Sequence, residues 1–201
     1  MKGLFLKDLY MIKAYFRTLI AIAVVFIISS FWGGGNMFLI IYPMIVAAML
    51  PMSILSYDEK SRWDVYCGTL PCSKSAVVSV KYLSCLVYVA VMFALSLLVQ
   101  SLRITRAGGD MSELAVIMAM LLSIGLVGPS LMLPVIFRLG TEKGRMAYYV
   151  VIGALCALSF LLPEKLPSAL ANSVALLPLA AAALFAASWL LSIYFYRKRE
   201  L

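Results

Sequence analysis

The chain of 201 residues contains no histidine, and charged residues make up only 13% of it. Without histidine, it has no imidazole for a catalytic triad, a metal site or a proton relay. Four cysteines are present, but Cys67 and Cys72 lack a second pair or a histidine to complete a tetrahedral zinc site. No GxxxxGK[ST] phosphate-binding loop occurs. We therefore expect no metal, no cofactor and no enzymatic site, and an intramembrane enzyme has little to be built from.

Hydrophobic residues dominate what is present. They form 64% of the chain, and the mean hydropathy is +1.02. Soluble domains carry roughly 25% charged residues, so a chain this apolar cannot cover its surface in water. The first eighteen residues are too charged for the apolar core of a secretory signal peptide. The composition indicates an integral membrane protein.

Long windows without charge define the membrane spans. A spanning helix needs about 20 residues, and the window 18–57 is long enough for two such helices with a turn at the glycines 33–35. The sequence predicts an all-α, polytopic membrane domain over residues 1–201. Its six transmembrane helices are expected at about 14–32, 36–56, 82–102, 114–137, 146–163 and 173–196.

The basic residues predict the orientation. With both termini inside, all 17 Lys and Arg residues except Arg103, Arg106 and Lys165 lie in cytoplasmic segments, as the positive-inside rule requires. We therefore place the protein in the cell membrane with both termini cytoplasmic. The net charge of +8 fits contact with anionic lipids. It does not indicate nucleic acid as a partner, because the charges are spread over four separate segments.

Residues 1–17 predict an interfacial amphipathic helix before the first span. Basic side chains on it reach the headgroups, and apolar ones face the lipid. The basic set is Lys2, Lys7, Lys13 and Arg17, and the apolar set is Leu4, Phe5, Met11, Ile12, Tyr15 and Phe16. The alternative is that these basic residues only stop transfer before the first span.

The segment 57–81 is the longest polar interruption between spans, and its spacing predicts a short helix. Ser56 and Glu59 match the S-x-x-E capping box, so we expect a helix to begin there. Opposite charges at i,i+4 would support it, in the pairs Asp58–Arg62 and Lys60–Asp64.

Aromatic side chains and two breaks complete the pattern of this segment. Trp63 and Tyr66 would share one face. Gly68 and Pro71 end the helix, and Ser73 caps the next one. The segment is either an interfacial turn with belt aromatics or a docking site for a cytoplasmic partner, since Trp, Tyr and Arg dominate binding energy at interfaces.

An amino-terminal amphipathic helix and a hairpin of two spans precede this loop. In this arrangement the loop resembles that of the type-2 ABC transporter permeases. It is most similar to small bacterial members whose ATPase is a separate polypeptide. The pattern is D-E-K-x-x-W-D-x-Y followed by L-P-x-S-x-x-x-V-V-x-x-K-Y, carried by Asp58, Glu59, Lys60, Trp63, Asp64, Tyr66, Leu70, Pro71, Ser73, Val77, Val78, Lys81 and Tyr82.

The resemblance implies a function and partners. The loop at 57–81 would hold the coupling helix that docks on the nucleotide-binding subunit. This role falls on Glu59, Lys60, Arg62, Trp63, Asp64 and Tyr66. ATP and magnesium would be bound by the partner ATPase, and a second permease subunit would make a homodimer or heterodimer. Small members export peptides, antibiotics or lipids.

The spans bear on the mechanism. They lack the mid-membrane ionisable groups on which secondary carriers depend, which favours energy from a docked ATPase. Gly125, Gly128 and Pro129 form a candidate hinge, although glycine and proline are also ordinary residues of membrane helices. The alternative function is a non-transporting immunity or sensory subunit that binds a peptide or partner protein. Copurification of an ATPase stimulated by this chain would separate the two functions.

Overall fold

The computed structural model describes residues 2–15, 17–32, 36–63, 66–67, 73–107, 111–144, 146, 149–150 and 176–198. Regular structure in these ranges is helical, and no strand occurs within them. The principal helices are α1 (Lys2–Tyr15), α2 (Arg17–Trp32), α3 (Met37–Lys60), α5 (Lys74–Ala107), α6 (Met111–Leu139) and α9 (Leu177–Lys198). The all-α prediction is confirmed.

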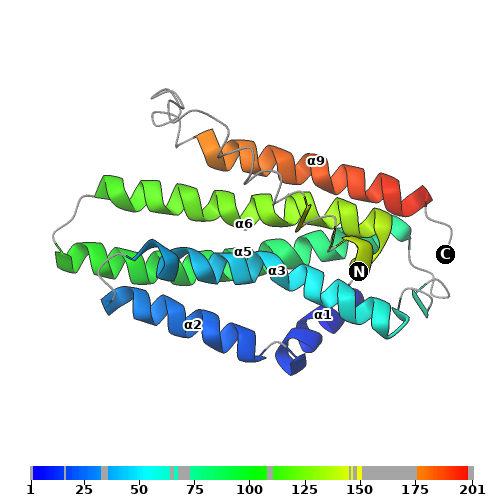
Figure 1. Ribbon diagram of the computed structural model, residues 1–201, viewed down its shortest axis with the longest axis horizontal. Helices are drawn as coiled ribbons and strands as arrows, with labels where there is room; N and C mark the ends of the chain where they lie inside the picture. Colours follow the sequence, from blue (N-terminus) through cyan, green and yellow to red (C-terminus); the bar gives the residue numbers. More distant parts are fainter. Residues whose placement is uncertain are drawn as a thin grey trace.

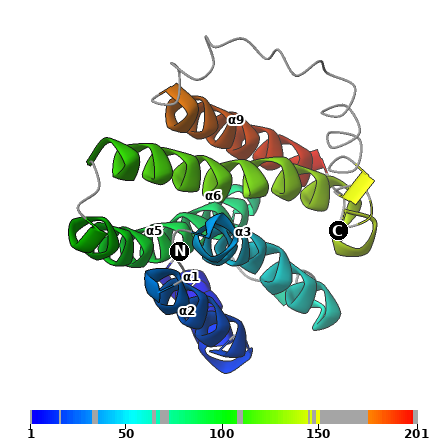
Figure 2. The same cartoon turned by 60° about the vertical axis from the view of Figure 1, so that its left-hand side comes forward.

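The long helices form a bundle, and α1 runs in a different direction from them. Helices α3, α5 and α6 pack against one another, α9 packs on α5 and α6, and α2 lies beside α3 and α5 (Figure 1). Helix α1 lies at one end of the bundle, at an angle to α2, and contacts α5 (Figures 1 and 2). The chain therefore changes direction sharply between α1 and α2 (Figure 1).

Four helices are long and apolar enough to cross a membrane, namely Met37–Lys60, Lys74–Arg106, Leu114–Leu139 and Leu177–Lys198. Helix α2 has 16 residues and is shorter than these four. It begins at Arg17, three residues after the start of the predicted first span at residue 14. Most of the predicted fifth span, 146–163, lies outside the described residues. The count of six spans stays a prediction.

Small residues and buried polar pairs hold the spans together. A Cβ on Gly125 of α6 would lie 3.0 Å from Val89 Cγ1 of α5 and 3.1 Å from Met44 of α3. Glycine thus permits α6 to approach both neighbours closely. Between α5 and α9, the buried hydroxyl of Tyr82 lies 2.7 Å from both Ser188 Oγ and Ser192 Oγ. These contacts fix how α6 and α9 sit on the central helices.

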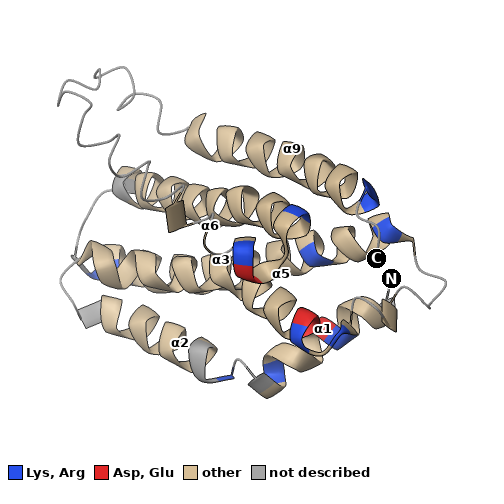
Figure 3. Cartoon of the chain, turned by 45° about the vertical axis from the view of Figure 1, so that its right-hand side comes forward, with Lys and Arg blue, Asp and Glu red and all other residues tan. Residues whose placement is uncertain are grey.

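Polar residues gather at one end of the bundle. The middle stretches of α5, α6 and α9 carry no charge, whereas charged residues cluster on and around α1 (Figure 3). The carboxy-terminal end of α9 lies at this same end, where the Tyr196 ring stands 5.5 Å from Phe137 near the end of α6. The ends of α3 and α6 and the start of α5 are therefore close to both terminal helices, as the predicted topology requires. Which side of the membrane this end faces stays a prediction.

Candidate functional site

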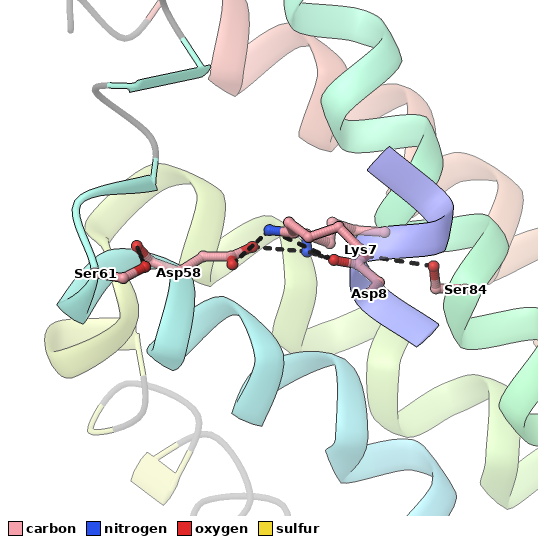
Figure 4. A network of polar contacts seen from close by, with 6 residues as sticks. Lys7, Asp8, Asp58, Ser61 and Ser84 are labelled. Atoms are coloured by element: carbon pink, nitrogen blue, oxygen red, sulfur yellow. Dashed lines mark hydrogen bonds and ion pairs between the residues drawn. The ribbon is translucent and has the colours of Figure 1, made fainter. Parts of the chain in front are cut away.

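Three buried charges and the half-buried Lys7 form a closed ring of alternating sign at this end. Lys7 Nζ lies 2.6 Å from Asp58 Oδ1, and Lys81 Nζ lies 2.7 Å from Asp58 Oδ2 and 2.6 Å from Asp8 Oδ1. A distance of 3.6 Å between Lys7 Nζ and Asp8 Oδ1 closes the ring. Ser84 Oγ stands 3.5 Å from Asp8 Oδ2 (Figure 4). The ring ties α1, α3 and α5 together.

Because these charges are largely shielded from water, each one needs its partners in the ring to be stable. The side chains of Asp8, Lys81 and Asp58 are 1%, 6% and 8% exposed, and that of Lys7 is 21% exposed. A buried charge that loses its partner is strongly destabilising, although a complete buried pair adds little net stability. The ring therefore fixes the relative positions of three helices more than it raises stability.

The ring corrects two expectations for the polar segment. Asp58 pairs with Lys7 and Lys81 and not with Arg62, because the side chain is buried between helices and not on a solvated helix face. The capping-box prediction at Ser56 is also wrong. Helix α3 continues without a break to Lys60, so Ser56 lies in its interior. The cap at Ser73 is confirmed, since its Oγ accepts a 3.3 Å hydrogen bond from the N–H of Ala76.

The ring also corrects the expected lipid-facing side of α1. Ile12 is only 6% exposed and packs with Leu50, Ile54 and Tyr88 of the bundle. Leu6, Leu9 and Tyr10 are the large apolar residues of α1 that are exposed. The helix is rotated relative to the prediction because Asp8 must reach Lys81. Its interfacial position stays a prediction.

A turn after α3 brings Trp63 back onto α1. Arg62 has a positive φ of 52°, and its N–H bonds the carbonyl of Glu59 at 3.1 Å, as in a left-handed helix end. Lys7 Nζ then lies 4.2 Å from the centre of a Trp63 ring, within the range of a cation–π contact. The rings of Trp63 and Tyr66 are 5.3 Å apart, so the prediction that they share a face is confirmed.

Glu59 connects the same segment to the end of α6. The chain leaves α6 through Gly140, whose φ is 84° and whose N–H bonds the carbonyl of Ile136 at 2.8 Å. This left-handed cap requires glycine or a similarly tolerant residue. It presents the N–H of Thr141, which donates a 2.7 Å hydrogen bond to Glu59 Oε2. Thus Trp63 contacts α1, and Glu59 contacts the segment after α6.

A small cavity lies between these contacts. Its volume is about 60 Å³, and it is bordered by the ends of α3, α6 and α9 and the start of α5. Asp58, Glu59, Lys81 and Thr141 supply its polar wall, opposite Phe137 and Tyr196. The polar segment is therefore in contact with every long helix that ends here.

The candidate residues differ in their surroundings. Glu59, Lys60, Arg62 and Tyr66 are exposed, and Trp63 is half-buried. Asp64 lies outside the described residues, so the predicted Lys60–Asp64 pair does too, as do Gly68 and Pro71. Trp63, Tyr66 and Cys67 have helical geometry, and the full coupling helix stays a prediction. Docking by these residues stays a prediction as well.

The candidate hinge lies in an unbroken helix. Pro129 and Pro134 are inside α6, which is continuous from Met111 to Leu139. A Cβ on Gly128 would lie 3.2 Å from the Cβ of Ala48, so this glycine, like Gly125, permits close packing. Bending at Gly125, Gly128 and Pro129 stays a prediction.

Sequence reasoning missed the ring itself. From the sequence, Lys7 is expected at the headgroups and Lys81 in the polar loop, and no role is expected for Asp8. One signal was available, because Asp8 is the only acidic residue among the first 57 positions. An isolated carboxylate at the membrane surface with basic neighbours is usually paired.

The four long apolar helices define a multi-pass helical membrane protein with charged residues gathered at one end (Figure 3). Comparison with protein-family models gives a match to the ABC-2 family transporter protein model over residues 3–197. The chain belongs to this family and is a permease, the membrane transport subunit of an ABC transporter. A comparison with curated proteins gave no match, and a comparison with solved structures gave none either.

Proposed function

We propose that this permease is the membrane half of an exporter powered by a separate cytoplasmic ATPase, which docks on the loop at 57–81. The residues that contact the ATPase are Glu59, Lys60, Arg62, Trp63, Asp64 and Tyr66. The substrate class is a peptide, an antibiotic or a lipid-like molecule. Export is favoured because the loop around 103–113 is too short for an external capture domain.

One observation supports the coupling role above the others. The end of α3 and the turn after it hold two different parts of the bundle at once. Trp63 in the turn contacts Lys7 of α1, and Glu59 in the last turn of α3 accepts a hydrogen bond from Thr141 after α6. Lys7 belongs to the buried ring, so a displacement of Trp63 acts on α1, α3 and α5 together. A segment that transmits ATP-driven movement to the membrane helices needs such contacts with several of them.

The partners follow from this proposal. ATP and magnesium bind to the ATPase subunits, and this chain supplies no cofactor site. Two copies of the permease, or one copy and a related subunit, form the pathway. Both termini and the charged end lie in the cytoplasm of a cell whose plasma membrane the chain crosses, and anionic lipids contact its basic residues.

The test is ATPase coupling in purified complexes. We expect the chain, extracted in mild detergent, to copurify with an ATPase whose activity it stimulates. Trp63→Ala should leave insertion and yield unchanged but weaken docking by about 30-fold, because truncating a central interface tryptophan costs about 2 kcal/mol or more. Phe38→Ala is the matched control, since Phe38 is 60% exposed at the other end of α3.

Two results would refute the proposal. Normal substrate-stimulated ATPase activity in Trp63→Ala would remove the coupling role from this segment. A chain that sequesters a peptide and copurifies with no ATPase would instead be a non-transporting immunity or sensory subunit.

A further inference from the structure

A second site lies at the bend between α1 and α2 (Figure 1). A cavity of about 520 Å³ opens there, lined by Leu9, Ile12 and Lys13 of α1 and by Arg17 and Ile20 of α2. Its two polar residues are both basic, and its three other residues are apolar. None of the five belongs to the candidate docking segment.

Within the described part of the chain, Lys13 and Arg17 have no counter-charge. Several other basic residues of this end are engaged, Lys7 and Lys81 in the ring, Arg138 over Phe195 and Lys198 over Tyr194. Lys13 and Arg17 are exposed, and among the residues that the structure describes no carboxylate lies within 4 Å of either. The cavity therefore carries two positive charges that are left to an anion from outside.

The level of the cavity relative to the membrane surface indicates which kind of anion it would bind. Arg17 is the first residue of α2, and the sequence after it contains no charged residue up to position 57. Basic residues at the end of an apolar helix hold their charged groups at the level of the lipid headgroups. The apolar wall formed by Leu9, Ile12 and Ile20 then lies beside the first carbons of the acyl chains.

We propose that Lys13 and Arg17 bind the phosphate of an anionic phospholipid, with its first acyl carbons against Leu9 and Ile20. A free phosphate matches only the charged rim and leaves the apolar wall uncovered. A phospholipid matches both. This inference uses the proposed function only to assign the lipid to the cytoplasmic leaflet.

The site has a structural consequence. Lys13 lies in the last turn of α1 and Arg17 is the first residue of α2, so one headgroup bridges the two helices. Helix α1 also carries Lys7 and Asp8 of the ring. The bound lipid thereby holds in place the helix that contacts Trp63.

The experiment measures lipid binding to the full purified chain in detergent by native mass spectrometry. Short-chain phosphatidylglycerol is titrated against the parent and against Lys13→Gln/Arg17→Gln, with phosphatidylcholine of the same chain length in parallel. Each basic residue near an anionic lipid contributes a factor of about five, so the double variant should bind phosphatidylglycerol about 25-fold more weakly. Binding of phosphatidylcholine should not change.

Lys143→Gln/Arg197→Gln removes the same charge from exposed positions at the same end and should change phosphatidylglycerol binding by less than about twofold, since surface charge alone is screened. The proposal is overturned if the double variant binds like the parent, or if the control loses as much. It is also overturned if free glycerol phosphate competes as well as the lipid, which would make this an anion site. The ATPase takes no part in the measurement, so its outcome does not depend on the coupling proposal.

Discussion

Replacement of Lys81 by methionine breaks the ring at its more buried cation. Lys81 Nζ contacts Asp8 at 2.6 Å and Asp58 at 2.7 Å. At an effective dielectric constant near 20, each attraction is about 6 kcal/mol before desolvation is subtracted. After replacement, two carboxylates with exposures of 1% and 8% share the single charge of Lys7. Removing one partner of a buried pair typically costs 3–5 kcal/mol, so we expect a loss of about 4 kcal/mol.

The assay is reversible unfolding of the purified chain in mixed detergent and dodecyl sulfate micelles. Lys143→Met serves as the control, because Lys143 is an exposed cation at the same end, and substitutions at such positions usually change stability by less than about 0.5 kcal/mol. The double variant Lys81→Met/Asp8→Asn leaves Lys7 paired with Asp58 alone. It should recover about half of the loss, because contacting charges are not additive.

The reasoning fails if Lys81→Met unfolds at the same denaturant concentration as Lys143→Met. It fails equally if Asp8→Asn adds its own full cost to that of Lys81→Met. Either result would mean that the ring charges are solvated and do not depend on one another.

Two further predictions concern the packing of the spans and use the same unfolding assay. Gly125→Ala should lower the free energy of unfolding by about 1–2 kcal/mol, since the added Cβ would lie 3.0 Å from Val89. Gly3→Ala is the control and should cost no stability, because nothing lies within 4 Å of its Cβ position. Equal effects of the two substitutions would contradict the packing role of Gly125. Tyr82→Phe should cost about 1–2 kcal/mol by leaving two buried serine hydroxyls without their common partner, and Tyr42→Phe, on a half-buried residue, should stay within about 0.5 kcal/mol. A Tyr82→Phe variant as stable as its control would show that water replaces the hydroxyl.

Charge-free windows predicted the central helices well because hydrophobicity alone determines where a chain can cross a bilayer. The predicted spans 82–102 and 114–137 lie within α5 and α6, and 36–56 lies within α3 apart from its first residue, Asn36, which is the N-cap. The ends were less predictable. Helix α3 passes through Ser56 to Lys60, and α5 begins at Lys74, several residues before the predicted span. Both extensions carry polar residues, and a search for charge-free windows does not detect helix that contains such residues.

The polar contacts of the site were beyond local reasoning. The i,i+4 rule assigned Arg62 to Asp58, yet the partners of Asp58 come from positions 7 and 81. A single sequence does not indicate which distant residues pair with a buried charge. The aromatic pair Trp63–Tyr66 was predictable because it lies within one turn of chain. The contact of Trp63 with Lys7 was not, since it depends on the angle at which α1 meets the bundle.

The distribution of charges in the ring also determines which helix can separate from the others. Helix α1 contributes one cation and one anion, Lys7 and Asp8, whereas α3 contributes only Asp58 and α5 only Lys81. Withdrawal of α1 therefore leaves two neutral pairs, Lys7 with Asp8 at 3.6 Å and Lys81 with Asp58 at 2.7 Å. Withdrawal of α3 or α5 alone would leave an unpaired buried charge, which is far more costly. Hence α1, which also contacts Trp63, is the helix that this ring allows to move.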